Sequence, residues 1–223
     1  MPEGLEIPAD KLQLRLDFYS ESIVLTEYKA EARATVRLVS ADAIAGALAR
    51  DLTFSSGLLP PDVLWWQSGR QGSQVALWRP SKIWRVALKE DPFKPARRFR
   101  LPMPGLIFLC APQRPPAIYA LRRRPQTPDD RIYQAPTFNT FSGGGTCQGT
   151  HKYGEVVSGI PEEFFASYFT SAGDARGRSL AHPRSLLELW EELDGQKEYP
   201  LDDLVQQGTV ADLMHGKGGT LWH

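Results

Sequence analysis

Apolar and polar residues alternate along the first forty positions, which is the period-two pattern of half-buried β-strands. The alternation covers Lys11–Tyr19, resumes at Ile23–Lys29 after a turn at 20–22, and returns at Ala32–Leu38. We therefore expect a small antiparallel meander, which forms an N-terminal β extension over residues 1–39.

A helix and then a series of short strands are predicted next. Ser40 is a suitable N-cap for an amphipathic helix over Ala41–Leu52, in which apolar residues fall on one face. Gly and Pro residues then separate short apolar segments, as between strands. The predicted strands are Val63–Gln67, Gln74–Trp78, Ile83–Leu88, Leu106–Cys110 and Ala117–Arg122. Their tryptophans are expected in the core rather than in a ligand site.

The pattern becomes helical after residue 151. Pro161 suits the first turn of a helix. The apolar face of this helix would comprise Phe164, Phe165, Tyr168 and Phe169. A second helix is expected at Ser185–Leu193, and a third, broken by Gly208, at Leu201–Met214. An antiparallel meander sheet with flanking helices is an α+β fold.

Composition and charge narrow the classes of partner. Of the 223 residues, 42% are hydrophobic, which is ordinary for a globular protein. The 26 Lys and Arg residues balance the 26 Asp and Glu residues. The net charge therefore gives no reason to expect a nucleic acid or a membrane as a partner. No apolar run approaches the ~20 residues that cross a bilayer, and the first residues lack the pattern of a signal peptide. Two cysteines without a disulfide-scaffold pattern indicate a reducing compartment. We expect a cytoplasmic protein.

Candidate chemistry concentrates in residues 134–151. This stretch contains Cys147, the glycines Gly143, Gly144 and Gly145 shortly before it, and Asn139 eight residues upstream. Glycines permit a close approach by another chain, so the thiol could be open to a bulky partner. The amide of Asn139 could donate to an oxyanion formed at that sulfur. By contrast, Cys110 lies inside an apolar run and is expected to be an inert core thiol.

Several alternatives for Cys147 can be tested by spacing. The position where a phosphatase loop needs Arg is Tyr153, and neither the cysteines nor the four histidines have metal-ligand or redox spacing. Gly143–Gly145 is not followed by the Lys of a nucleotide-binding loop. We therefore expect no metal and no cofactor. A cysteine hydrolase that uses His151 or His182 stays open, as does a purely structural hairpin around the glycines.

A thiol that accepts an acyl group from another thioester has fewer requirements. It needs access, a poised thiolate and an oxyanion donor, but no resident histidine base. The arrangement Thr137-Phe138-Asn139, Gly143–Gly145, Cys147 resembles the active-site region of ubiquitin-conjugating enzymes, in which an Asn of a His-Pro-Asn motif lies eight residues before the cysteine. Here Thr137 and Phe138 replace the His and the Pro.

Further motifs are similar to those of one bacterial branch, the prokaryotic ubiquitin-conjugating family D, also called PRTRC system protein B. They are Leu59-Pro60-Pro61, Val63–Trp66, Leu101–Phe108, Tyr133–Asn139, Cys147-x-Gly149 and Glu163–Thr170. The resemblance implies a ubiquitin-conjugating-like core over residues 40–223, with the extension 1–39 packed on it. It implies that Cys147 and Asn139 are catalytic, with Gly143–Gly145, Thr137 and His151 as supporting residues of the loop.

The same resemblance implies partners and a role. The partners would be a ubiquitin-like protein, a ThiF-like activating enzyme and a protein substrate with an acceptor amine, and related operons are linked to defence against phage. The hypothesis is an enzyme that takes the modifier as a thioester on Cys147 and transfers it to an amine. The alternatives are an inactive scaffold that binds the ubiquitin-like protein and a cysteine hydrolase. The acidic residues Asp129, Asp130 and Asp174 could orient a lysine or simply be solvated.

Overall fold

Two compact units make up the chain, Met1–Leu58 and Leu59–His223. The structure, a computed structural model, describes residues 14–28, 34–44, 59–69, 72–91, 93–170 and 175–215. The expected packing of residues 1–39 on the remainder stays a prediction, as does a domain boundary after residue 39.

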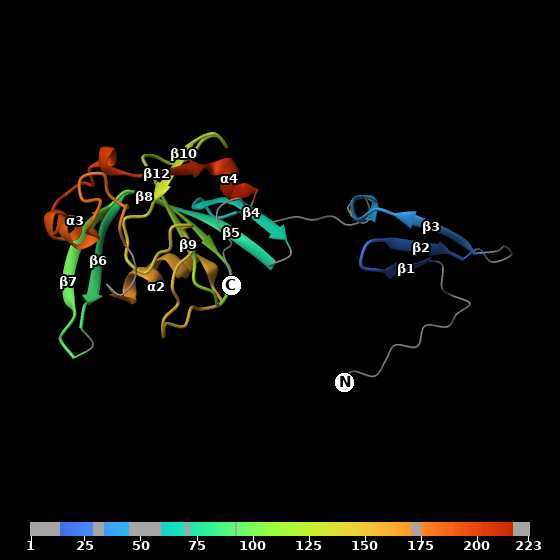
Figure 1. The fold of residues 1–223 in the computed structure, drawn as a ribbon, viewed down its shortest axis with the longest axis horizontal. Coiled ribbons are helices and arrows are strands. Elements are labelled where there is room, and N and C mark those ends of the chain that lie inside the picture. The colour runs from blue at the N-terminus through green and yellow to red at the C-terminus, as the bar shows by residue number, and fades with distance from the viewer. Residues whose placement is uncertain are drawn as a thin grey trace. The chain divides into compact units, whose positions relative to one another are not determined.

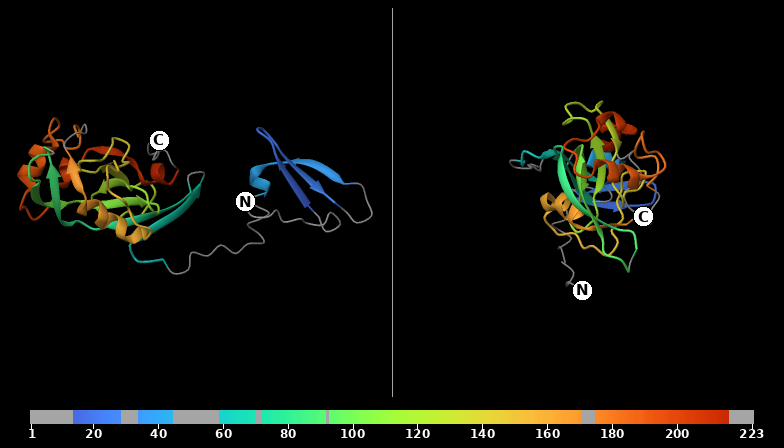
Figure 2. Two further views of the ribbon diagram at one scale, coloured as in Figure 1. Left: turned by 90° about the horizontal axis from the view of Figure 1, so that it is seen from below. Right: turned by 90° about the vertical axis from the view of Figure 1, so that its left-hand side faces the viewer.

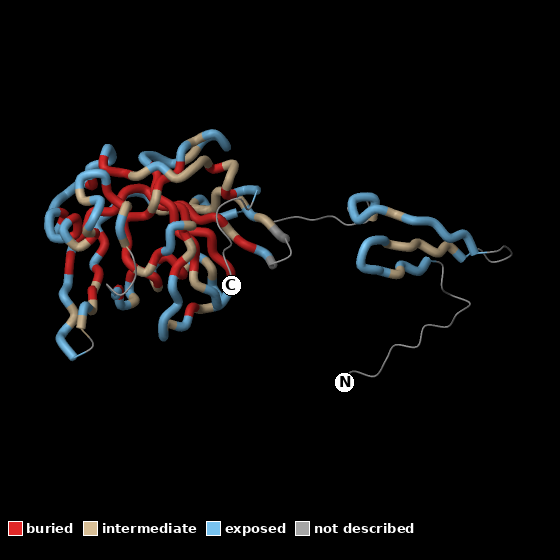
Figure 3. The backbone as a smooth tube through the Cα atoms, in the orientation of Figure 1, coloured by how far each residue is buried: buried red, intermediate tan, exposed pale blue. Residues whose placement is uncertain are grey.

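The first unit contains the antiparallel meander that the alternating pattern predicts. Its strands are β1 (Leu14–Phe18), β2 (Ile23–Glu27) and β3 (Thr35–Val39), and they lie side by side in that order (Figure 2). None of the residues described in this unit is buried (Figure 3). The predicted helix over 41–52 begins as expected at 41–44, and its remainder lies outside the described residues.

The second unit is an α+β arrangement of two sheets and short helices (Figure 1). Its elements are β4 (Val63–Gly69), β5 (Gly72–Arg79), β6 (Lys82–Lys89), β7 (Arg97–Met103), β8 (Gly105–Cys110), β9 (Ala117–Leu121), β10 (Arg131–Gln134), the 3₁₀ helix η2 (Val157–Gly159), α2 (Ile160–Ala166), β11 (Tyr168–Thr170), α3 (Leu186–Leu193), the 3₁₀ helix η3 (Leu201–Asp203), β12 (Gln206–Thr209) and α4 (Val210–Met214).

The strands do not follow one another as a simple meander. One sheet has the order β12-β10-β9-β8-β5-β4, whereas the β6–β7 hairpin forms a second sheet with β11 on its edge. β5 therefore pairs with β8 and not with β6. β11 runs parallel to β6, with Phe169 opposite Leu88.

β8 is buried along its whole length, as its apolar run predicts. Leu106, Phe108 and Cys110 belong to one core cluster, while the intervening Ile107 and Leu109 belong to another. The first cluster takes residues from α2 and α3 and the second takes residues from α4, so helices cover both faces of the sheet.

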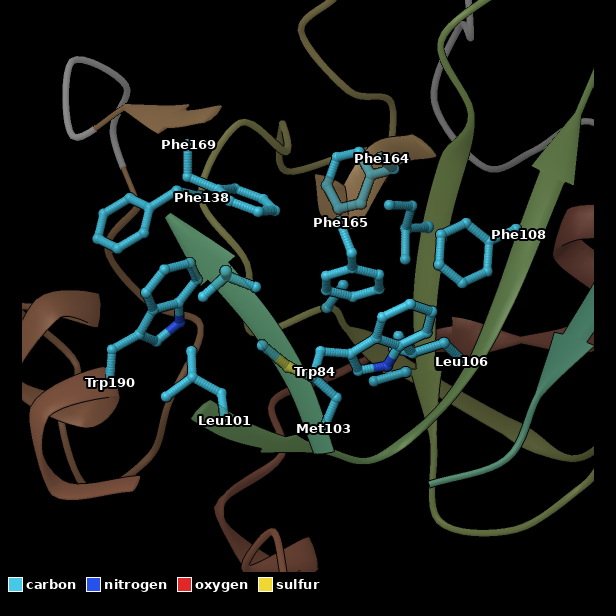
Figure 4. Packing of buried hydrophobic residues seen from close by; sticks show 14 of the residues in the cluster. Trp84, Leu101, Met103, Leu106, Phe108, Phe138, Phe164, Phe165, Phe169 and Trp190 are labelled. Carbon is cyan, nitrogen blue, oxygen red and sulfur yellow. The ribbon is translucent and has the colours of Figure 1, made fainter. Parts of the chain in front are cut away.

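The larger cluster brings aromatic side chains from distant segments together. Trp190 of α3 makes edge-to-face contacts with Phe99, Phe138 and Phe169, with ring centroids 4.8–5.7 Å apart. Figure 4 shows Phe138, Phe169 and Trp190 gathered at one end of this cluster. Phe138 directly precedes Asn139, so this packing holds one side of the candidate site.

Two of the expected helical assignments are wrong. Tyr168 and Phe169 do not extend the face of α2, because the chain leaves the helix at Ser167 and continues as β11. The third predicted helix, Leu201–Met214 with a break at Gly208, is wrong in its middle, since Gln206–Thr209 pairs with β10 as a strand before α4 starts. Thr209 and Asp212 form a capping box where α4 starts. Each side chain accepts a backbone N–H group of the first turn, as expected for the beginning of a new helix.

His182 makes the stability of the region around α3 depend on pH. Its ring lies 2.7 Å from Glu192 and 3.6 Å from Glu188, and the hydrogen bond with Glu192 is the main cause of a raised pKa of His182. A raised folded pKa means that the stabilisation is complete below the unfolded pKa of about 6.5 and is lost as pH rises through the folded pKa. Both glutamates are exposed and therefore screened by solvent, although His182 is only 21% exposed, so we expect the stabilisation to be less than about 1 kcal/mol.

The Tm of His182→Gln should therefore fall below the wild-type Tm at pH 5.5 and approach it at pH 8.5. Glu192→Gln should remove most of this pH-dependent difference. A gap between the wild-type and His182→Gln melting temperatures that stays constant over this pH range would contradict the assignment.

Candidate functional site

Residues 139–147 form a short hairpin whose base carries both candidate catalytic residues. The N–H of Cys147 donates to the carbonyl of Asn139 at 2.8 Å, and Thr140 pairs with Thr146 on the next rung. Both threonines are buried, whereas Cys147 is exposed and Asn139 half-buried. The eight-residue spacing therefore places Asn139 and Cys147 opposite each other at the open end of the hairpin.

The tip of the hairpin is fixed against β9. Gly144 accepts a hydrogen bond from Ile118 N–H at 2.8 Å, and the Tyr119 hydroxyl donates to the carbonyl of Gly143 at 2.7 Å. Burial raises the pKa of Tyr119 to about 12, so its hydroxyl remains a donor at neutral pH. The hairpin is therefore well anchored. Because Gly144 has no side chain, its backbone can pack directly against the ring of Tyr119.

Gly144→Ala is expected to destabilise the protein by more than about 2 kcal/mol. Gly144 has φ +89°, which a side chain disfavours, and an added Cβ would lie 2.4 Å from the Tyr119 ring. Gly145→Ala is the matched control, because its Cβ would meet only Phe141 at 3.9 Å. Thermal unfolding measures both, and equal Tm values for the two variants would contradict this account.

The Asn139 carboxamide is bound to the edge of β11. Its Nδ2 donates to the carbonyl of Tyr168 at 2.9 Å, and its Oδ1 accepts from the N–H of Thr170 at 3.0 Å and from the Thr170 hydroxyl at 3.1 Å. This amide therefore occupies the place that a neighbouring strand would take. Nδ2 carries a second N–H, for which the structure gives no acceptor among the described residues.

The backbone of Asn139 is also unusual. Its φ is +59°, in the left-handed region that Asn tolerates better than most residues. The side-chain bonds to β11 hold this conformation, and the preceding Phe138 is anchored in the core.

Cys147 and Asn139 line one pocket of about 530 Å³. The other residues that line it are Gln134, Phe138, Thr140, Phe141, Ser142, Thr170, Ala175, Arg176, Gly177 and Arg178. The size falls in the range of small-molecule and peptide sites. Cys110, by contrast, is fully buried in β8, and burial raises the pKa of its thiol.

Side chains from later segments hold the polypeptide that leads into the hairpin. Arg178 is 2% exposed and donates to the carbonyls of Ala135 and Thr140, and the Trp190 indole donates to the carbonyl of Pro136 at 2.9 Å. Thr137 is fully buried and its hydroxyl bonds to that of Thr140 at 2.7 Å. Thr137 therefore supports the loop from inside and does not face the pocket.

His151 is placed differently from Asn139. Its ring packs edge-to-face on Tyr153, and its Nε2 is buried without a hydrogen-bond partner among the described residues. It is not among the residues that line the Cys147 pocket.

The acidic candidates are not shown to face the pocket. Asp130 accepts two backbone N–H groups of the 126–130 turn, which lower its pKa, and Asp174 lies outside the described residues.

A family model described as Prokaryotic E2 family D matches residues 41–207, more than half of the chain and including the whole pocket. The chain belongs to this family. Membership of an E2 family indicates a role in ubiquitin-like conjugation, with a ubiquitin-like protein and an activating enzyme as the general kinds of partner. No curated protein and no solved structure matches the chain.

The structure of this E2-family chain adds residues that the sequence did not single out. Arg178, Tyr119, Trp190 and Thr170 all contact the segment around Asn139 and Cys147. The sequence placed Trp190 on the inward face of its helix, Tyr119 in a strand and Thr170 in the motif Glu163–Thr170, but it predicted no contact of theirs with the site. Among the described residues no group of His, Cys, Asp and Glu gathers that could hold a metal ion, and no described helix is long and apolar enough to cross a membrane.

Proposed function

We propose that this protein is a ubiquitin-conjugating-like acyltransferase. It accepts a ubiquitin-like protein from a ThiF-like activating enzyme as a thioester on Cys147 and transfers it to an amine of an acceptor. The observation that carries the proposal is the exposed thiol of Cys147, which shares a 530 Å³ pocket with Asn139, its neighbour across the hairpin.

The fold supports this proposal in its order of elements. Helical residues at 41–44 precede a series of antiparallel strands, the hairpin with the thiol follows β10, and α2 and α3 come after it. This order is similar to that of ubiquitin-conjugating enzymes, and we propose a variant of that fold. In it, β6 and β7 form a separate sheet with β11, and the strands β1, β2 and β3 precede the family match.

The proposed reaction has two acyl transfers. The Cys147 thiolate attacks the carbonyl carbon of the modifier's thioester, a new C–S bond forms, and the thiolate of the activating enzyme leaves. An acceptor amine then attacks the same carbon, a C–N bond forms, the C–S bond to Cys147 breaks, and the amine proton passes to water. In both steps the carbonyl oxygen becomes an oxyanion, and during discharge to the amine the second N–H of Asn139 would donate to it.

A loading assay tests the proposal. The protein is incubated with ATP, a ThiF-like activating enzyme and a ubiquitin-like protein from the same conjugation system, and a reductant-sensitive adduct is expected. Cys147→Ala should abolish the adduct, and Cys147→Ser should give an ester that resists reductant. Cys110→Ala is the matched control and should load normally. An adduct that persists in Cys147→Ala and disappears in Cys110→Ala would refute the assignment.

The same experiment separates the alternatives. Binding of the ubiquitin-like protein without any adduct would select the scaffold. The described residues give the hydrolase no support, because the Nε2 of His151 is buried and neither His151 nor His182 lines the Cys147 pocket.

A further inference from the structure

The hairpin that carries Cys147 has a buried face and an outer face. Its middle pair, Thr140 and Thr146, is 7% exposed at each residue and points into the protein. Successive side chains of paired strands point to opposite faces, so the flanking residues Phe141, Gly145 and Cys147 lie on the outer face. Phe141 is 60% exposed, and Cys147 is exposed. The outer face therefore presents an aromatic ring and the thiol, with a glycine next to both.

The fold does not require glycine at position 145. Gly144 has φ +89°, which favours glycine, whereas the φ of Gly145 lies outside the left-handed region. Among the described residues, a Cβ at Gly145 would meet only the Phe141 ring, at 3.9 Å, which is an ordinary van der Waals contact. Since neither conformation nor packing excludes a side chain here, the consequence of this glycine lies at the surface, where it leaves the backbone next to the thiol uncovered.

Phe141 is fixed across the hairpin from Gly145. Its N–H donates to the carbonyl of Gly145 at 2.7 Å, and its carbonyl accepts from the N–H of Gly144 at 2.9 Å. Cys147 is its diagonal neighbour, and residues in such positions are about 7–8 Å apart, within reach of an aromatic ring. The ring therefore forms a wall on one side of the uncovered backbone, and the thiol lies at the edge of the same surface.

We propose that Phe141 and Gly145 select the acyl donor by its last residue. The acyl chain on Cys147 lies over Gly145 and against the Phe141 ring, so the α-carbon next to the thioester occupies the place where a side chain at 145 would be. A glycine residue fits this place, whereas the side chain of a branched residue such as valine meets the ring. The inference rests on the proposed acyl transfer at Cys147 and specifies the acyl residue that it favours.

Acylation of Cys147 by two small thioesters tests the selection without an activating enzyme. The donors are the 2-mercaptoethanesulfonate thioesters of N-acetyl-glycyl-glycine and N-acetyl-glycyl-valine. The thiolate attacks the carbonyl carbon, a C–S bond forms and 2-mercaptoethanesulfonate leaves. Cys110→Ala serves as the background, because Cys147 is then the single thiol of the chain. Intact-mass measurements give both rates.

The glycyl-to-valyl rate ratio is expected to be about tenfold higher for the folded protein than for the same chain in urea, which corrects for the intrinsic difference between the donors. Phe141→Ala should lower the folded ratio towards the unfolded value, and Phe141→Tyr, which retains the ring, should preserve it. Phe93→Ala is the matched control, since Phe93 is 96% exposed but belongs to the connection between β6 and β7. A folded ratio at or below the unfolded one, or one that Phe141→Ala leaves unchanged, would overturn the proposal.

Gly145→Ala separates the selection from a general effect on the thiol. The added methyl group occupies the place of the acyl α-carbon, so the rate with the glycyl donor should fall about fivefold. The Tm and the rate of alkylation of Cys147 by iodoacetamide should stay close to their wild-type values, because the fold and the access to the sulfur are unchanged. Equal decreases in acylation and alkylation would count against the selection.

Enzymatic loading distinguishes a failure of this inference from a failure of the proposed function. Normal loading, together with a glycyl-to-valyl ratio that matches the unfolded chain, would overturn the inference and leave the proposed function intact. A raised ratio without any thioester from the activating enzyme would refute the proposed function and uphold the selection at Cys147.

Discussion

Asn139→Gly is expected to slow discharge of the Cys147 thioester by about 10²-fold while the thioester still forms. Loss of one oxyanion donor typically costs ~10²–10³ in rate. Glycine accepts the φ of +59° without strain, so this variant removes the carboxamide and spares the backbone. Asn139→Ala would add backbone strain to the same loss. Single-turnover discharge to a free amine, with loading followed separately, measures the effect.

Two further variants separate an oxyanion role from the attachment to β11. Thr170→Val removes only the hydroxyl contact to Oδ1 and should discharge at close to the wild-type rate. Asn139→Asp retains an acceptor for Thr170 but loses both N–H donors, so it should discharge slowly. If Asn139→Gly failed to load but discharged normally whatever thioester it formed, Asn139 would have only a structural role.

Trp190→Ala is expected to destabilise the protein by about 3–5 kcal/mol, the usual cost of truncating a fully buried tryptophan. For a chain of this size the Tm should fall by roughly 6–20 °C. The variant also leaves the carbonyl of Pro136 without its indole donor, three residues before Asn139. Thioester discharge at a temperature where the variant is still folded should therefore be slower too.

Trp190→Phe is the matched control, because it retains an aromatic ring against Phe138 and Phe169 while it loses the N–H. Its free energy of unfolding should fall by about 1–3 kcal/mol. Equal unfolding free energies for Trp190→Phe and Trp190→Ala would show that the hydrogen bond, and not the packing, dominates.

Local patterns were sufficient to predict most strands and the helix α3. β4, β5, β6, β8 and β9 lie where alternation or apolar runs between Gly and Pro predicted them. α3 begins after Ser185, whose side chain accepts the N–H of Glu188. Alternation, turn residues and helix caps depend on residues that are close in sequence, so these elements can be predicted from the sequence alone.

The errors concern elements that distant partners determine. β11 has only three residues and exists because it pairs with β6, and β12 exists because it pairs with β10. Short segments such as these have weak intrinsic preferences that tertiary contacts override.

The candidate site also has features that were predictable from local sequence and features that depend on distant residues. The spacing of Asn139 and Cys147 was visible, and the hairpin explains why it places the two residues opposite each other. Arg178 was not recognisable, because a single arginine in a loop gives no sign that it will be buried between two carbonyls. The attachment of Asn139 to Tyr168 and Thr170 was equally hidden.

That attachment has a consequence for how the protein is made. A growing polypeptide leaves the ribosome at roughly 5–20 residues per second from its N-terminus, so Cys147 emerges before β11, Arg178 and Trp190 do. Until those later residues are available, neither the carboxamide of Asn139 nor the carbonyls around it have their partners. An unfinished chain thus presents the sulfur of Cys147 without these surrounding contacts, and only translation past α3 supplies all the residues that hold the segment around it.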